Sequence, residues 1–230
     1  IEIQGNVNPD ERSLFVGGFV GSMIATVTFG TISGTEGKGE AVNTGDIIFE
    51  GTANKKLAIG GFLGVYHTTT SLGSSIPKIN TGNIKATGVF QSQTTYDANN
   101  YVGVGGFTGY HNIETASTKK RYVDVQCYCE IEAYTVTKNG DEYQFTPYPR
   151  VGLLTGSQLP NTDGSSSNIS VGGKIATTAT VVDGEVVPTW ADITKDNYID
   201  YIIGVDGLTG FSTVNWLESE NEITWVNFGN

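Results

Sequence analysis

The sequence predicts an all-β protein built from stacked repeats, and three observations lead to that prediction. The 230 residues include 31 glycines but only six prolines, and 16% of them are charged. Thr, Ser, Asn, Val, Ile and Tyr are abundant, which favours strands and turns over helices, and no long segment has apolar residues at helical spacing. A glycine-rich motif also recurs at a regular interval, as "VGGFVG" at 16–21, "IGGFLG" at 59–64 and "VGGFTG" at 104–109.

A second element alternates with this motif. The segment "NTGDIIFEG" at 43–51 is echoed by "NTGNIKATG" at 80–88, and the opening "IEIQG" at 1–5 matches its end. A weaker match is "NISVGG" at 168–173. We therefore expect each repeat to contain at least two short strands separated by tight turns.

Two looser copies extend the first motif, "VGLLTG" at 151–156 and "DGLTG" at 206–210. The intervals between successive four-residue cores are 43, 45, 47 and 54 residues, with the cores starting at Gly18, Gly61, Gly106, Leu153 and Gly207. Atypical terminal copies are expected in a repeat protein, because the ends of a stack must be capped. The sequence thus predicts about five stacked units.

Each unit has a third strand candidate, at 25–32 in the first and 74–79 in the second. A unit of this size cannot bury its own apolar face, so we expect the units to stack through parallel strands about 4.8 Å apart. Stacking aligns the following side chains in one ladder: Phe19, Phe62, Phe107, Leu153 and Leu208. Strict alternation places Val16, Ile59 and Val104 on the opposite face. Either that face is covered too, or the doubled glycine resets the alternation.

The second half departs from this pattern. Hairpins are predicted at 133–145, turning at Asn139-Gly140, at 179–187, turning at Asp183-Gly184, and at 211–230. They are either insertions and a cap on the last open edge or part of a small β-sandwich. We expect regular repeats over 1–120, and degenerate repeats with hairpins and a C-terminal cap over 121–230. Any boundary lies near 118–122, within what we expect to be one continuous domain.

Cys127 and Cys129 are predicted to be buried free thiols. Two residues apart on a strand, they face the same side with poor geometry for a disulfide, and two ligands alone do not form a zinc site. The chain opens in strand-like sequence with no visible signal peptide, so a removed leader or upstream domain is expected.

The repeat unit, three Gly-Gly-Phe-x-Gly copies phased with two Asn-Thr-Gly-[Asp/Asn]-Ile elements, resembles the GLUG-type glycine-rich repeats of large bacterial surface proteins, those of Bacteroides-like bacteria above all. The resemblance covers residues 1–110 well and the remainder faintly. It implies a right-handed parallel β-helix, located outside the cell or on its surface and acting in adhesion. With five copies of the motif, we expect such a β-helix to have about five coils and a hairpin-rich C-terminal cap. The family shares no catalytic residues, so the resemblance implies none here.

Charge and hydropathy argue against nucleic acid as a partner and against a membrane span. The formal net charge of −11 repels nucleic acid, and no apolar run is long enough to span a membrane. The densest acidic set consists of Asp192, Asp196, Asp200 and Asp206. It could bind calcium, but it lacks the spacing of an EF-hand loop, and a solvated turn is the preferred interpretation. No metal or other cofactor is therefore predicted, with calcium as a weak alternative. The same two readings, calcium loop or turn, apply to 161–168.

Aromatic residues are the candidate binding groups. Tyr66, His67, Tyr110 and His111 follow the glycine-phenylalanine motif and come together on stacking, one residue out of register. They form either a patch that stacks on a sugar ring or ordinary packing, and packing is preferred. Trp190, Trp216 and Trp225 are either core residues or a carbohydrate-stacking surface, and Trp190 is the candidate chosen among them. No Ser-His-Asp arrangement is present.

The leading functional prediction is a non-enzymatic adhesin or binding module that recognises a glycan or a host surface protein. The first alternative is a polysaccharide lyase or hydrolase on the same fold. That alternative requires two acids, or an acid and a Lys or Arg, converging in a groove, and the sequence shows no such convergence. The second alternative is a structural spacer that binds nothing.

Overall fold

The computed structural model describes residues 1–7, 13–23, 39–53, 56–67, 76–90, 101–112, 122–148, 150–158, 167–204 and 223–227. In these segments the regular structure is almost entirely strand, and the single helical element is the 3₁₀ turn η1 (Tyr198–Tyr201). The predicted all-β class is confirmed. No helix in this part of the chain is long and apolar enough to cross a bilayer.

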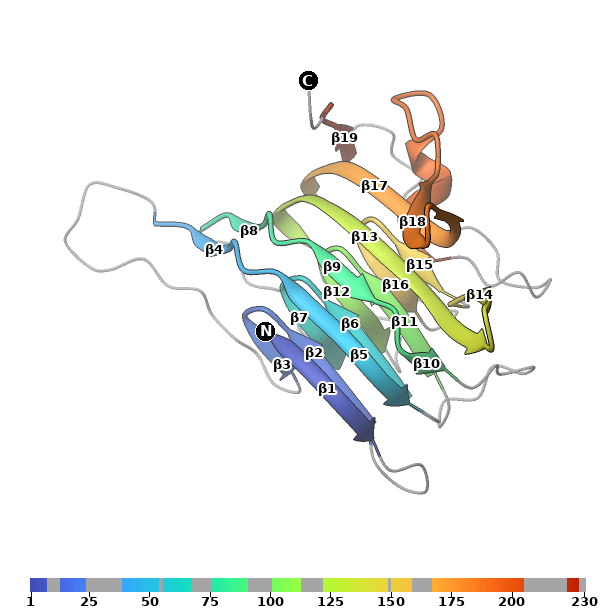
Figure 1. Cartoon of the computed structure of the whole chain (residues 1–230). Coiled ribbons are helices and arrows are strands. Elements are labelled where there is room, and N and C mark those ends of the chain that lie inside the picture. The colour runs from blue at the N-terminus through green and yellow to red at the C-terminus, as the bar shows by residue number, and fades with distance from the viewer. Residues whose placement is uncertain are drawn as a thin grey trace.

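The described strands form three sheets (Figure 1). The large sheet contains β1 (Glu2–Val7), β4 (Ala41–Asn43), β5 (Ile47–Ala53), β8 (Lys78–Asn80), β9 (Ile84–Ala86), β10 (Val89–Phe90), β13 (Val123–Asn139), β14 (Glu142–Pro147), β17 (Ser167–Val182), β18 (Glu185–Trp190) and β19 (Ile223–Trp225). The second sheet contains β2 (Ser13–Gly17), β6 (Lys56–Gly60), β11 (Tyr101–Gly105) and β15 (Val151–Gly152). The third contains β3 (Val20–Met23), β7 (Leu63–His67), β12 (Thr108–Asn112) and β16 (Thr155–Gln158).

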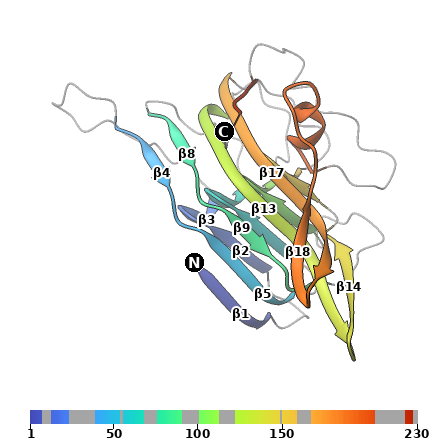
Figure 2. The ribbon, with the colours of Figure 1, turned by 45° about the horizontal axis from the view of Figure 1, so that its top comes forward.

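Each successive repeat contributes its strands to the three sheets in the same order. β1, β2 and β3 lie in the large, second and third sheets, and they are followed by β5, β6 and β7, then β9, β11 and β12, then β13, β15 and β16. Strands of neighbouring repeats pair in parallel, as between β1 and β5, β6 and β11, and β7 and β12. The predicted parallel stacking of repeats is therefore confirmed, and the strands of the large sheet lie side by side in Figure 2.

The register aligns like residues on the buried face of the large sheet. Ile47, Ile84, Ile131 and Ile175 are direct partners across four strands, and each is almost fully buried. Along β13 buried residues alternate with partly exposed ones, as a strand with one covered face requires. The main buried cluster collects side chains from all three sheets. One core therefore runs through the stack.

The Gly-Gly-Phe motif forms the corner between the second and third sheets. In the second repeat β6 ends at Gly60 and β7 begins at Leu63, so Gly61 and Phe62 make the bend. Ile59 and Phe62 are both fully buried in the same cluster, although they are three positions apart and strict alternation would place them on opposite faces. The doubled glycine thus resets the alternation, and it does so by turning a corner.

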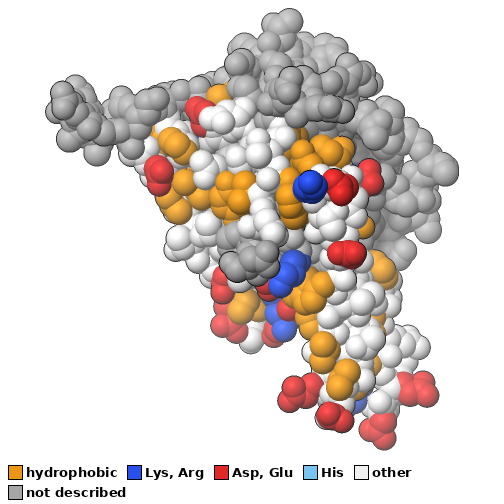
Figure 3. All heavy atoms as spheres, turned by 90° about the horizontal axis from the view of Figure 1, so that it is seen from above, with side chains coloured by type: hydrophobic (Ala, Val, Ile, Leu, Met, Phe, Trp, Pro, Cys, Tyr) orange, Lys and Arg blue, Asp and Glu red, His pale blue; other side chains and the backbone are white. Residues whose placement is uncertain are grey.

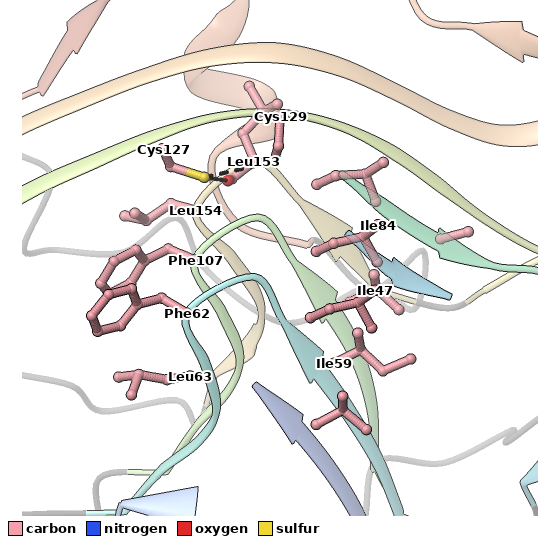
Figure 4. Packing of buried hydrophobic residues seen from close by; sticks show 14 of the residues in the cluster. Ile47, Ile59, Phe62, Leu63, Ile84, Phe107, Cys127, Cys129, Leu153 and Leu154 are labelled. Atoms are coloured by element: carbon pink, nitrogen blue, oxygen red, sulfur yellow. Dashed lines mark hydrogen bonds between the residues drawn. The ribbon is translucent and has the colours of Figure 1, made fainter. Parts of the chain in front are cut away.

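The phenylalanine ladder is present. The rings of Phe19 and Phe62 are stacked with centroids 4.7 Å apart, and those of Phe62 and Phe107 with centroids 4.8 Å apart. The predicted next member, Leu153, is wrong by one residue. The Phe107 N–H donates to the carbonyl of Leu154, as Phe62 N–H does to Phe107, so the side chain of Leu154 continues the ladder (Figure 4).

The fifth copy of the corner lies at 201–204, "YIIG", and the prediction of a copy starting at Gly207 is wrong. The Leu154 N–H donates to the Ile202 carbonyl, Ile203 pairs in parallel with Thr155, and Gly204 N–H donates to Thr155 O. The interval from Leu153 to Tyr201 is 48 residues, close to the earlier ones. The position held by phenylalanine in the first three copies requires only a buried apolar side chain. Similarity to the Gly-Gly-Phe motif therefore did not locate the fifth copy. Leu208 lies outside the described residues.

The Asn-Thr-Gly element is tied to the corner by hydrogen bonds. Asn43 Nδ2 donates to the carbonyl of Gly61 at 2.9 Å, and Asn80 Nδ2 donates to that of Gly106 at 2.8 Å. Asn43 also donates to Asn80 Oδ1 at 2.8 Å. Glycine is required at the corner because a Cβ on Gly61 would lie 2.1 Å from Asn80 Nδ2. The two sequence motifs are therefore one structural unit.

Cys127 replaces asparagine in the next repeat. It pairs in register with Asn80, and its Sγ lies 3.2 Å from the carbonyl of Leu153. Cys127 and Cys129 are free and fully buried, with Sγ atoms 3.7 Å apart, which confirms the prediction of two buried thiols. Burial and the neighbouring Cys129 thiol raise the pKa of Cys127 well above its ordinary value.

Two of the three predicted hairpins are present as extensions of the large sheet. β13 and β14 pair Asn139 with Glu142, so the turn residues are Gly140 and Asp141, and the predicted turn at Asn139-Gly140 is wrong by one residue. β17 and β18 turn at Asp183 and Gly184, whose φ angles of 53° and 84° are those that a two-residue hairpin turn needs. Of the third, at 211–230, the described part is β19, which pairs in parallel with β17.

Three further predictions have mixed outcomes. The strand candidate at 74–79 overlaps β8 of the large sheet, and the one at 25–32 lies outside the described residues. The match of 168–173 to the Asn-Thr-Gly element is wrong in register, because Ile131 pairs with both Ile84 and Ile175. The counterpart is "VGGKI" at 171–175. The division at residue 120 stays a prediction, although β9 and β13 pair across it.

Candidate functional site

The aromatic patch predicted from the tyrosines and histidines lies largely inside the protein. Tyr66 pairs in register with His111, one position out of line as predicted, and their rings stack at 4.6 Å. Both rings also contact that of Tyr122, and all three side chains are fully buried. Tyr110 is equally buried, in a separate small cluster. These three predicted residues therefore pack inside the fold, in line with the packing alternative, and the side chain of His67 lies outside the described set.

The acidic stretch forms a turn. Asn197 organises it, accepting a hydrogen bond from Thr194 N–H at 2.7 Å and donating to the Asp192 carbonyl at 2.8 Å. Asp192, Asp196 and Asp200 are exposed. Within the described residues no three His, Cys, Asp or Glu side chains are placed to bind one metal ion. Asp206, Trp216 and the segment 161–166 lie outside that set.

Trp190 lies on the outer face of the large sheet and is partly exposed. It borders a surface hollow of about 190 Å³, here called the Trp190 hollow. The hollow is lined by Asp46, Ile47, Ile48, Asn83, Ile84, Lys85, Glu130, Glu132 and Trp190. These residues come from β5, β9, β13 and β18 and the turns before β5 and β9, and Figure 2 shows these four strands together with β17 on one face.

One row of the hollow is a hydrogen-bonded polar chain across the repeats. The Asn83 N–H donates to Asp46 Oδ1 at 2.8 Å, and the Glu130 N–H donates to Asn83 Oδ1 at 2.9 Å. Lys174, the register partner of Glu130, donates from Nζ to Glu130 Oε1 at 3.0 Å. Each side chain is thus held by the neighbouring repeat, which preorganises the row for a ligand.

The adjacent row carries the aromatic group. Lys85 and Glu132 are direct partners, with Nζ and Oε2 3.9 Å apart, and Glu132 is followed by Ala176 and Trp190. Because Ala176 is small, the indole packs over it. Lys174 Nζ lies 5.6 Å from the centre of the indole, within the range of a cation–π contact.

Tyr134 supports the floor beside this row. Its hydroxyl donates to Glu132 Oε2 at 3.2 Å, and the ring is buried next to Ala176. Burial, followed by the negative charge of Glu132, raises the pKa of Tyr134. The phenol therefore stays protonated at neutral pH and serves as a constant donor that orients Glu132.

This arrangement combines the apolar face of the Trp190 indole with hydrogen-bonding groups of both positive and negative charge. Side chains of both charges and hydrophobic side chains are interspersed on the surface seen in Figure 3. The lysines are about half exposed, so their ion pairs contribute little to stability. An aromatic face beside several fixed polar groups suits a ligand that has both an apolar face and many hydroxyls, such as a pyranose ring.

Sequence reasoning found Trp190 and missed the charged groups around it. The missing signal was the alignment of "NTGNI" at 80–84 with "CYCEI" at 127–131 and "VGGKI" at 171–175. That alignment places Asn83, Glu130 and Lys174 in one row. The glycines that mark the repeat elsewhere are replaced in "CYCEI", so the correspondence was hidden.

Comparison with known proteins finds no matching family model, no matching curated protein and no matching solved structure.

Proposed function

We propose that this chain is a non-enzymatic binding module that recognises a glycan through the Trp190 hollow. The observation that carries the proposal is the partly exposed indole beside an ordered row of carboxylates, an amide and a lysine. A sugar ring would stack on the indole while its hydroxyls exchange hydrogen bonds with Asn83, Glu130 and Lys174. A host surface protein is the alternative ligand for the same surface.

The proposal includes a setting for the module. We infer a right-handed parallel β-helix of about five coils with a hairpin-rich C-terminal cap, supported by the constant order of the sheets and by the general right-handedness of parallel crossovers. The repeat motifs support a relationship to GLUG-type surface proteins of Bacteroides-like bacteria. Such a module would act outside the cell or on its outer surface, in adhesion.

The test is a screen of the purified chain against mucin and plant polysaccharides that reads both retention and release of shorter products. Trp190→Ala is expected to weaken retention of any bound glycan by about tenfold or more, because a buried aromatic anchor carries a large share of binding energy. Val187→Ala is the matched control, since Val187 is an exposed residue of the same strand. Unchanged binding by Trp190→Ala would contradict the proposed site.

One observation favours a second candidate, a carbohydrate-active enzyme. Glu130 and Glu132 lie on one face of β13 beside Lys85 and Lys174, which is the convergence of acids and cations that such chemistry needs. Each carboxylate, however, is paired with a lysine on an exposed sheet face. Release of shorter products, lost in Glu130→Gln or Glu132→Gln, would establish the enzyme. Neither retention nor release would favour a protein ligand or a spacer.

A further inference from the structure

A second hollow lies on the same face, farther along the same strands. It measures about 380 Å³ and is called here the Glu50 hollow. It is lined by Glu50, Gly51, Thr52, Thr87, Gly88, Val89 and Val136. β5 and β13 line both hollows, β9 lines the first, and the chain that continues β9 lines the second.

The two hollows border the same small apolar cluster. Trp190 of the first hollow and Val136 of the second both pack against the cluster of Tyr134, Ala176 and Ala179. Along β5 the outward positions run from Ile48 through Glu50 to Thr52, which is about 13 Å at the rise of a strand. Together the two hollows, here called the depression, follow one another along the strands over a length greater than that of one sugar ring.

Gly51 and Gly88 are among the residues that line the Glu50 hollow. A Cβ on Gly88 would lie 2.2 Å from the Gly51 carbonyl oxygen, so this floor of paired backbone requires glycine at position 88. Behind this floor the Tyr148 hydroxyl donates to the Gly88 carbonyl at 3.0 Å and holds the backbone in place. The depression is thus a fixed feature of the repeat and is open to an extended ligand.

The charges of the depression select against an anionic ligand. Four carboxylates line it, those of Asp46, Glu50, Glu130 and Glu132, and Lys85 is the lining cation. Lys85 and the adjacent Lys174 are already paired with Glu132 and Glu130. The four carboxylates outnumber these two lysines and the Ile1 ammonium, which donates to the Asp46 carbonyl at 2.7 Å, on a chain with a formal net charge of −11. Arginine, the residue best suited to clamp carboxylates or sulfates, is absent from the lining set.

We propose, building on the glycan-binding function above, that the ligand is a neutral linear oligosaccharide. It lies along the strands, with one ring on Trp190 and further rings in the Glu50 hollow. The charges of the lining residues disfavour uronate and sulfated glycans.

The experiment measures binding of mannohexaose, cellohexaose, their disaccharides and the hexamers of mannuronate and glucuronate with the same linkages, by calorimetry at low salt. A neutral hexasaccharide is expected to bind about tenfold or more tightly than both its disaccharide and its uronate counterpart. Equal or tighter binding of a uronate hexamer, or equal binding of disaccharide and hexasaccharide, would overturn the proposal.

A charge-reversal variant separates the two hollows. Glu50→Lys is expected to strengthen binding of the uronate hexamer several-fold and to leave disaccharide binding at Trp190 unchanged. Glu185→Lys makes the same change in net charge at an exposed hairpin residue and is expected to leave both unchanged. Equal effects of the two variants would overturn the role of the Glu50 hollow.

Failure of this inference is distinguishable from failure of the proposed function. Uronate binding that Trp190→Ala abolishes would leave the glycan-binding function standing and overturn the neutral-ligand inference. Binding of none of these sugars, together with no retention in the polysaccharide screen, would overturn both.

Discussion

At the corner between the second and third sheets the first three repeats carry Phe19, Phe62 or Phe107, whereas the later ones carry Leu154 and Ile202. The backbone hydrogen bonds at the corner are the same in both regions. The regular region therefore adds an aromatic ladder to a geometry that aliphatic residues also support.

The polar column beside the corner differs in the same way. Asn43 and Asn80 donate to corner carbonyls in the regular region, and Cys127 takes that place in the next repeat, with Val171 as its register partner. The later region also has the longest strands, β13 and β17, and the hairpins that carry Val136 and Trp190. The comparison teaches that strict repetition builds the stack and one side of the candidate site, and that the departures from it add Glu130, Glu132 and Trp190.

The largest expected effect tests the aromatic ladder that distinguishes the regular region. Phe62→Ala is expected to lower the free energy of unfolding by about 3–5 kcal/mol, because Phe62 is fully buried between two rings. Phe19→Ala is the control and should cost less than about 2 kcal/mol, since Phe19 is 49% exposed. Urea denaturation measures both. A loss below about 1 kcal/mol for Phe62→Ala would contradict a buried ladder.

A smaller effect is expected at the polar column. Asn80→Ala removes the donor to the carbonyls of Gly82 and Gly106, which are left buried, and should cost about 1–3 kcal/mol. Cys127→Ala removes only a weak thiol donor, so its cost should be smaller. Urea denaturation of the two variants side by side checks this order, and the reverse order would show that the asparagine column does not hold the corner.

The smallest expected effect is the pH dependence contributed by Cys127. Its pKa is raised in the folded state by burial and by Cys129, so the unfolded chain ionises first and binds fewer protons. Stability is expected to fall as the pH rises above the ordinary pKa of a thiol, about 8.5. Cys127→Ala should show a shallower fall between pH 8 and 10. Identical slopes for variant and parent would refute the shifted pKa.

Much of the architecture was predictable because the same sequence motifs recur in successive repeats and form the same strands and corner. Three copies of Gly-Gly-Phe-x-Gly indicated the stack, and the spacing of Phe19, Phe62 and Phe107 predicted the ladder. The fifth corner at 201–204 was missed because a buried aliphatic position has no distinctive residue. The burial of Tyr66 and His111 was also undecided in the sequence, since either face of a strand can carry an aromatic residue.

By itself the sequence determined the β class, the repeat length, the parallel stacking and the two hairpins. The spacing of the motifs indicates the repeat and its stacking, and the turn residues indicate the hairpins, so both can be recognised from local sequence. Only the tertiary structure decided the corner, the coupling of Asn80 to Gly106, and the grouping of Trp190 with Glu130, Lys174 and Asn83. The physical reason is register. Parallel strands whose partner residues are 37 or more positions apart in the chain meet at about 4.8 Å spacing, and a shift of one residue would turn every side chain to the other face.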